Sequence, residues 1–218
     1  MNGKASPERK ATGSYHHGDL REALIEAAFI ITDKEGIEAV TFSALAKVLG
    51  VSQAAPYRHF KDRQELLAAV AARAFRETGK AFRNKIGKRG RSSKLRKIAH
   101  AYLELGLSSR ALYKLMYASH LLGCSTTDSE LYQAADENFD MILEAIDPRL
   151  DELTRRRFAL KFWTSLHGIV MLAEEGILPP KIHKISVREL IDELVHDTEA
   201  SISAAVYKII FIQSDTEN

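Results

Sequence analysis

The stretch TFSALAKVLGVSQAAPYRHF, residues 41–60, decides the fold of this chain. Thr41 is a favoured residue type for capping the start of a helix, and Gly50 supplies the left-handed backbone at which a short helix ends. Ser52 is then placed to cap a second helix over 53–60, which is too short to be stable without neighbours. Two short capped helices joined at a glycine are the pattern of a helix-turn-helix.

Apolar residues in this stretch predict a small core between the two helices. Small side chains let helices cross closely, and a polar outer face suits a second helix that enters the major groove of DNA. Pro56 lacks the N–H for an early backbone hydrogen bond, so we expect this helix to start irregularly and the base-contacting positions to shift by up to one residue. The expected core residues are Ala46, Leu49, Val51, Tyr57 and Phe60.

Capping signals and helical spacing predict the neighbouring helices. Asp19 and Glu22 resemble a capping box that opens a first helix, which should end near Gly36. Asp62 and Glu65 resemble a second one, opening a long helix. Further helices are expected at about 93–109, 111–122, 128–146, 150–175 and 186–212.

The composition favours helices throughout. Hydrophobic residues make up 45% and charged residues 28% of the 218 residues, a mix typical of a packed globular protein. Five prolines and twelve glycines are few in a chain rich in helix-forming residues, so we expect an all-α fold.

Cys124 is the single cysteine, which excludes an internal disulfide framework and favours a reducing compartment. With no signal-peptide pattern and no long apolar run, we expect a protein of the cytoplasm without a membrane partner.

Charge divides the chain into two parts. Residues 1–97 hold 20 Lys and Arg against 10 Asp and Glu, whereas the remainder holds 11 against 19. The basic part is suited to contact a polyanion, of which nucleic acid is the obvious candidate, and a solvated surface is the alternative.

The region around the helix-turn-helix resembles the TetR family of bacterial transcriptional regulators. The matching features are an amphipathic first helix, Thr41 before the second helix, and the segments LGVS (49–52), YRHF (57–60) and KDRQELL (61–67). Together they cover about residues 15–70.

The resemblance implies roles for individual residues. The recognition helix of the family matches Gln53 to His59, so Gln53, Ala54 and Ala55 are the positions nearest base edges, where glutamine can pair with adenine and alanine can contact thymine methyls. Tyr57, which is also a candidate core residue, matches a position that grips phosphate. The expected DNA-binding residues are Thr41, Ser43, Ser52, Gln53, Ala54, Ala55, Tyr57, Arg58, His59 and Lys61.

The family also implies the organisation of the whole chain. We expect a flexible basic tail (1–14), a helix-turn-helix DNA-binding domain of three helices (15–62), and a larger helical domain (63–218) that binds an effector and dimerises. The helix 63–84 should connect the two, and the helices near 150–175 and 186–212 should form the homodimer interface. Their apolar faces are wider than one partner helix needs, which independently favours an interface.

The segment WTSLHG (163–168) resembles a Trp-His-Gly signature in a subgroup of TetR regulators. Apolar residues with a few polar groups in this half of the chain are the usual components of a small-molecule site. An ordinary helical core is the alternative for each of them. The candidate effector-binding residues are Tyr113, Met116, Tyr117, His120, Phe139, Ile142, Trp163 and His167.

The leading hypothesis is a homodimeric repressor that an unknown small molecule releases from a palindromic operator. We expect no catalytic residue, no cofactor and no metal ion. A second hypothesis, a small helical enzyme using His120, His167 and Asp136 or Glu137, lacks any catalytic or metal-binding motif in the sequence. A third, a DNA-architectural or protein-partner role without any effector, would be favoured by a C-terminal core that encloses no cavity.

Overall fold

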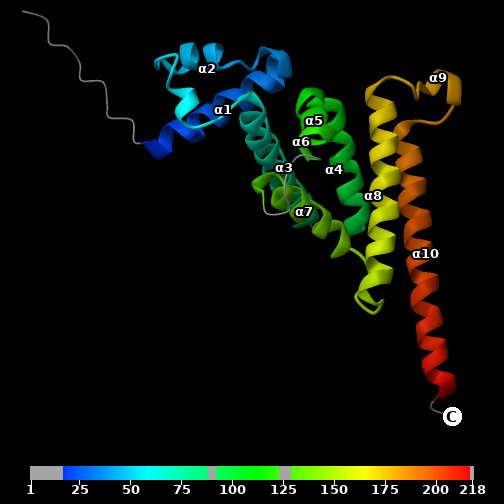
Figure 1. Cartoon of the computed structure of the whole chain (residues 1–218). Helices are drawn as coiled ribbons and strands as arrows, with labels where there is room; N and C mark the ends of the chain where they lie inside the picture. Colours follow the sequence, from blue (N-terminus) through cyan, green and yellow to red (C-terminus); the bar gives the residue numbers. More distant parts are fainter. Residues whose placement is uncertain (1–16, 88–91, 123–128, 217–218) are drawn as a thin grey trace, which may run out of the picture.

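The computed structural model describes residues 17–87, 92–122 and 129–216, and these residues form helices and connecting turns (Figure 1). This confirms the expected all-α fold. The expected tail (1–14) and Cys124 lie outside the described residues. The elements are α1 (His17–Glu35), η1 (Ile37–Ala39), α2 (Phe42–Leu49), η2 (Pro56–Arg58), α3 (Arg63–Gly87), α4 (Lys94–Ser108), α5 (Arg110–Met116), α6 (Ser119–Leu122), α7 (Glu130–Leu143), α8 (Glu152–Glu174), α9 (Pro180–His183) and α10 (Val187–Thr216).

The start and end of α2 are as predicted. The Thr41 side chain accepts a hydrogen bond from the Ala44 N–H at 3.1 Å, which satisfies one of the free donors of the first turn. Gly50 ends the helix with φ 66° and ψ 29°, a left-handed conformation that costs glycine little because it has no Cβ. These two residues therefore define the short first helix of the helix-turn-helix.

The α-helix expected over Gln53–Phe60 is wrong. The chain forms a turn at Gln53 and Ala54 and then the single 3-10 turn η2, and backbone hydrogen bonds such as Ala55 N to Ser52 O span three residues. Pro56 is the first residue of η2 and carries no N–H, so an α-helical bond to the preceding turn cannot form there. The irregularity predicted for Pro56 thus extends over the whole segment.

Of the two predicted capping boxes, the second one forms. The Asp62 carboxylate accepts from the Glu65 N–H at 2.9 Å, and Glu65 reaches back to the Lys61 N–H at 2.6 Å, one residue before the cap. α1 begins at His17, so Asp19 lies within the helix and is not its cap. The first box is therefore wrong in position.

Some helices in the second half are shorter than expected. The segment 111–122 is divided into α5 and α6 by a break at Tyr117 and Ala118. α7 ends at Leu143, before the expected end near 146, and the connection 176–186 contains the short α9.

Two apolar clusters hold the helices together. The first joins α1, α2 and the first half of α3 to α5 and the start of α7, and the second joins the end of α3 to α4, α7, α8 and α10.

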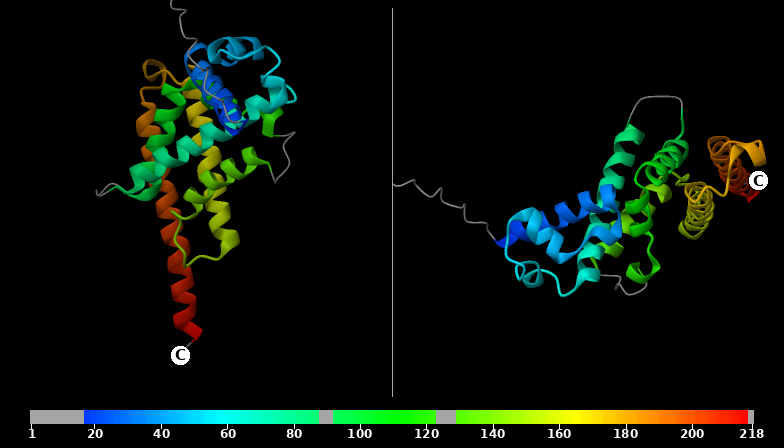
Figure 2. Two further views of the ribbon diagram at one scale, coloured as in Figure 1. Left: turned by 90° about the vertical axis from the view of Figure 1, so that its left-hand side faces the viewer. Right: turned by 90° about the horizontal axis from the view of Figure 1, so that it is seen from above.

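The helices α8 and α10 lie side by side at the far end of the molecule from α2 (Figures 1 and 2). Both also contact α4, which lies between them and α3. None of the helices in the described ranges is long and apolar enough to cross a membrane.

Candidate DNA-binding surface and ligand pocket

The N-terminus of α2 and the turn η2 lie next to each other at one end of the molecule. The Phe42 and Tyr57 rings meet edge to face, with centroids 4.7 Å apart. Phe42 is buried, whereas Tyr57 is 64% exposed, so a purely buried core role for Tyr57 is wrong. The edge-to-face contact holds an aromatic ring at the surface, where it presents a phenolic group to solvent.

Most of the predicted DNA-binding residues are exposed around this contact. Ala55 and His59 are half-buried. Two residues of the small predicted core, Ala46 and Phe60, are buried as expected. The exposed residues are Thr41, Ser43, Ser52, Gln53, Ala54, Tyr57, Arg58 and Lys61.

Arg63 holds this surface on α3, a role that sequence reasoning missed. Its Nε donates to the Val40 carbonyl at 2.8 Å and its Nη2 to the Ile37 carbonyl at 2.5 Å, just before α2. Glu38 lies 3.6 Å from the same guanidinium. Because the partners are mainly backbone carbonyls more than twenty residues earlier, no local pattern points to this contact.

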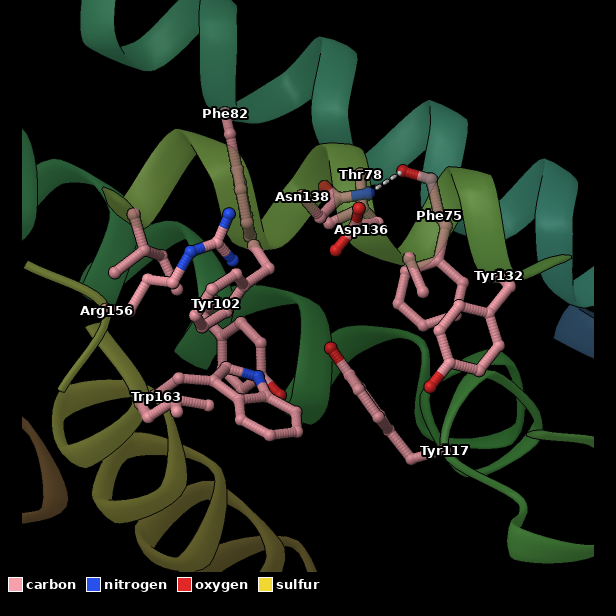
Figure 3. Close-up of a pocket in the computed structure, with 14 residues that line it drawn as sticks. Phe75, Thr78, Phe82, Tyr102, Tyr117, Tyr132, Asp136, Asn138, Arg156 and Trp163 are labelled. Carbon is pink, nitrogen blue, oxygen red and sulfur yellow. Dashed lines mark hydrogen bonds between the residues drawn. The ribbon is translucent and has the colours of Figure 1, made fainter. Parts of the chain in front are cut away.

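The second site is a cavity of about 520 Å³ between α3, α4, α7 and α8 (Figure 3). Half of its lining residues are aromatic, and three of its residues come from the middle of the connecting helix α3. A cavity of this size, lined by apolar rings and a few polar groups, is typical of a small-molecule site. The lining residues are Phe75, Thr78, Phe82, Tyr102, Tyr117, Tyr132, Ala135, Asp136, Asn138, Phe139, Ile142, Arg156, Leu160 and Trp163.

The structure brings together most of the candidate effector-binding residues, but only some of them line the cavity. Those that line it are Tyr117, Phe139, Ile142 and Trp163. Tyr113 and His167 lie behind the wall, in ring contact with Tyr117, and Met116 is fully buried. His120 does not line the cavity, because it follows the break after α5 and its side chain is exposed on α6.

Tyr102 of the wall forms an uncharged hydrogen-bonded cluster with Tyr113 and His167 behind it. The Nδ1 atom of His167 lies 2.9 Å from the Tyr102 hydroxyl and 2.8 Å from the Tyr113 hydroxyl. Burial lowers the pKa of His167 and raises the pKa values of Tyr102 and Tyr113. Burial likewise raises the pKa of Tyr117 to about 12. At neutral pH the imidazole is therefore neutral and the phenols are protonated, so these side chains share hydrogen bonds without carrying a charge.

Asn138 connects the cavity wall to α3. It is 9% exposed, and its Nδ2 donates to the Phe75 carbonyl on α3 at 2.9 Å and to the Ala134 carbonyl at 2.8 Å. Both partners are acceptors, so the amide nitrogen must face them. Its Oδ1 lies over Gly79, where a Cβ atom would come within 3.3 Å. The amide therefore fixes α7 against α3 at a close approach of the two helices.

Two family models match separate parts of the chain. The model described as "Bacterial regulatory proteins, tetR family" matches residues 24–70, and the model "Tetracyclin repressor-like, C-terminal domain" matches residues 95–198. The chain belongs to the TetR family of bacterial transcriptional regulators. As a TetR-family protein it is a DNA-binding transcriptional regulator, with the helix-turn-helix at its N-terminal end.

The chain is also similar to known sequences and solved structures. An uncharacterised helix-turn-helix transcriptional regulator of Mycobacterium tuberculosis, Rv0681, is 29% identical over 72% of this chain and 72% of its own length. A solved structure of a protein of unknown function from Rhodococcus sp. RHA1 is 27% identical, with a TM-score of 0.66 over 87% of this chain and 97% of that one. The fold is also that of a TetR variant from Acinetobacter baumannii AYE in complex with minocycline, which is 16% identical, with a TM-score of 0.55 over 86% and 98% of the two chains.

Proposed function

We propose that this TetR-family regulator is a homodimeric repressor that leaves a pseudo-palindromic operator when a small molecule occupies the cavity. The observation that carries the proposal is the course of α3. Leu66 and Val70 of this helix are fully buried in the core shared with α1, and Phe75, Thr78 and Phe82 of the same helix line the cavity. A ligand would therefore contact the helix on which the DNA-binding surface is built.

The apolar core supports coupling between the cavity and the DNA-binding surface. Leu112, Leu115 and Met116 of α5 belong to the same buried cluster as α1 and the first half of α3. A ligand shifts a conformational equilibrium only through its different affinities for the two states. We infer that the bound ligand favours an arrangement of α3 in which the two recognition surfaces of the dimer no longer match the operator. The cavity also favours this ligand-responsive hypothesis over a DNA-binding protein without an effector.

The outer faces of α8 and α10 support the dimer. Large exposed apolar side chains on these helices include Tyr207 at 72% and Phe211 at 62%. Contiguous exposed apolar surface is uncommon on soluble monomers and is typical of an interface. In a two-fold dimer through these helices, the two DNA-binding surfaces would read half-sites about one helical turn apart, roughly 34–36 Å. The other exposed large apolar residues of these helices that do not line the cavity are Leu153, Leu172 and Ile210.

Light scattering of the purified chain tests the dimer. We expect twice the chain mass of 24.4 kDa, and we expect Tyr207→Glu to shift the protein toward monomer because it places a charge in the proposed interface. Ile182→Glu, at an equally exposed position on α9, is the matched control and should leave the mass unchanged. A monomeric wild-type protein at micromolar concentration would contradict the proposal.

DNA binding at the proposed surface is tested by fluorescence polarisation with a pseudo-palindromic fragment from the region next to the gene. Lys61→Ala should weaken binding to all sequences and reduce the salt dependence by about one counterion per subunit, because lysine contacts phosphate. Gln53→Ala should instead reduce the preference for the operator over unrelated DNA. Lys181→Ala removes the same charge from α9, far from α2 (Figure 1), and should change neither property. Binding that none of these variants affects would refute the assignment.

Release is tested by titrating the operator complex with small molecules and repeating the titration with Ala135→Trp. The new indole should fill much of the cavity that Ala135 lines, so a molecule that releases the wild-type protein should no longer release the variant. If the variant responds like the wild type, the effector acts elsewhere.

A further inference from the structure

Aromatic side chains dominate the cavity wall. Half of its fourteen lining residues are aromatic, and Figure 3 shows their rings surrounding the space from several sides. The faces of aromatic rings carry partial negative charge, so they attract both flat apolar rings and cations. The aromatic residues are Phe75, Phe82, Tyr102, Tyr117, Tyr132, Phe139 and Trp163.

Several hydrogen-bond donors of the wall already have partners within the protein. The Tyr102 hydroxyl lies 2.9 Å from His167 Nδ1, and the Thr78 hydroxyl is directed at the Met116 sulfur at 3.9 Å. The amide nitrogen of Asn138 is held by two backbone carbonyls. A ligand that relied on accepting hydrogen bonds would have to displace these internal contacts.

The described residues that line the cavity include one carboxylate, Asp136, and one guanidinium, Arg156, and these two groups differ in their partners. Arg156 donates to the Glu152 carboxylate at 2.9 Å and also experiences the charges of Asp140 and Asp136. Within the ranges that the structure describes, no side chain forms a hydrogen bond or ion pair with Asp136, and Figure 3 shows its carboxylate facing the space between the rings. The pKa of Asp140 is raised by burial and then by the charge of Asp136, which outweighs the opposite effect of Arg156. Arg156 thus already has a carboxylate partner and feels two further carboxylates, whereas Asp136 has no paired cation among the described residues.

We propose that the ligand of this cavity is a flat aromatic cation with an N–H donor, stacked among the rings and paired with Asp136. This inference rests on the proposed ligand-responsive function and names the chemical class of its effector. A positive charge on an aromatic body gains from both the ring faces and the free carboxylate. Among the described lining residues, an anion could pair only with Arg156, which already has a carboxylate partner, and it would meet the charge of Asp136.

The test compares three molecules of the same shape and different charge, using the full-length protein. These are 9-aminoacridine, a cation at neutral pH, acridine, which is neutral, and acridine-9-carboxylate, an anion. Trp163 is the only tryptophan of the chain and lines the cavity, so quenching of its fluorescence reports binding at this place. Calorimetry supplies the affinities. We expect the cation to bind about tenfold more tightly than acridine, and the anion to bind least.

Variants of α7 and α8 identify the group that provides this preference. Asp136→Asn should weaken 9-aminoacridine about fivefold and leave acridine nearly unchanged, because it removes a charge and keeps the shape. Glu137→Gln removes the same charge from the next position, which does not line the cavity, and is the matched control. Arg156→Gln should leave the affinity for 9-aminoacridine equal or higher. If the cavity were instead a site for anions, this variant would bind acridine-9-carboxylate more weakly.

The results separate the class of ligand from the function of the cavity. If acridine or acridine-9-carboxylate quenches Trp163 at lower concentration than 9-aminoacridine, or if Asp136→Asn leaves the cation affinity unchanged, the proposed class is wrong. If acridine or acridine-9-carboxylate nevertheless releases the protein from the operator, the cavity still has an effector function. If none of the three quenches Trp163, the assignment to aromatic cations is overturned, and the release titration with Ala135→Trp decides on the effector function independently.

Discussion

Replacing Asn138 with aspartate should weaken the attachment of α7 to α3 and make the stability of the protein depend on pH. The Asn138 amide is 9% exposed and donates two hydrogen bonds, at 2.9 and 2.8 Å, to backbone carbonyls. A protonated aspartic acid can donate only one of these, a loss of about 1 kcal/mol. An ionised carboxylate faces the same carbonyl oxygens without a donor, which adds about 3 kcal/mol.

The sign of the pH dependence follows from these energies. An added cost of about 3 kcal/mol for the ionised form corresponds to a folded-state pKa about two units above the unfolded value near 3.9. The unfolded chain then loses its proton more readily than the folded one, so the variant loses stability as pH rises from about 4 to about 6. We expect a total loss of about 4 kcal/mol at pH 7.5 and about 2.5 kcal/mol at pH 5.

Urea unfolding followed by circular dichroism, at one fixed protein concentration, measures both values. Asn84→Asp makes the same chemical change at an exposed position on the same helix α3 and should change stability by no more than about 0.5 kcal/mol. If Asn138→Asp is as stable as this control at pH 7.5, or if its loss does not diminish on acidification, the assigned role of the amide is wrong.

Three further changes test the described contacts. Tyr57→Phe keeps the ring contact with Phe42 and removes only the hydroxyl, so operator affinity should fall about fivefold in polarisation assays with thermal stability unchanged. Gly106→Ala should cost about 1–3 kcal/mol in urea unfolding, because the new Cβ would lie 2.2 Å from a Val170 methyl group and would force α4 away from α8; an unchanged midpoint would contradict this packing. Thr41→Ala should cost about 1 kcal/mol by loss of the α2 cap, while Thr41→Ser, which keeps the hydroxyl, should restore most of it.

The starts of α2 and α3 and the family could be predicted from the sequence because their signals are local. Thr41 caps α2 through an N–H three residues away, Gly50 ends it through its own backbone, and Asp62 caps α3 in the same local way. The order of these signals over some fifty residues was enough to predict the helix-turn-helix. Pro56 also pointed correctly to an irregular recognition segment, although the irregularity extends further than the one residue expected and replaces the α-helix by a turn and η2.

The cavity and the contacts that connect it to α3 were decided by tertiary structure. Tyr117, Phe139, Ile142 and Trp163 were predicted, but Phe75, Tyr102 and Asn138 were not, because each is an ordinary core residue of its own helix. They meet only because helices distant in the sequence pack together, as Asn138 does with the Phe75 carbonyl 63 residues earlier. Arg63 was missed for the same reason, since its carbonyl partners lie before α2. Local periodicity determines which face of a helix is apolar, whereas the packing of several faces determines whether a cavity remains between them.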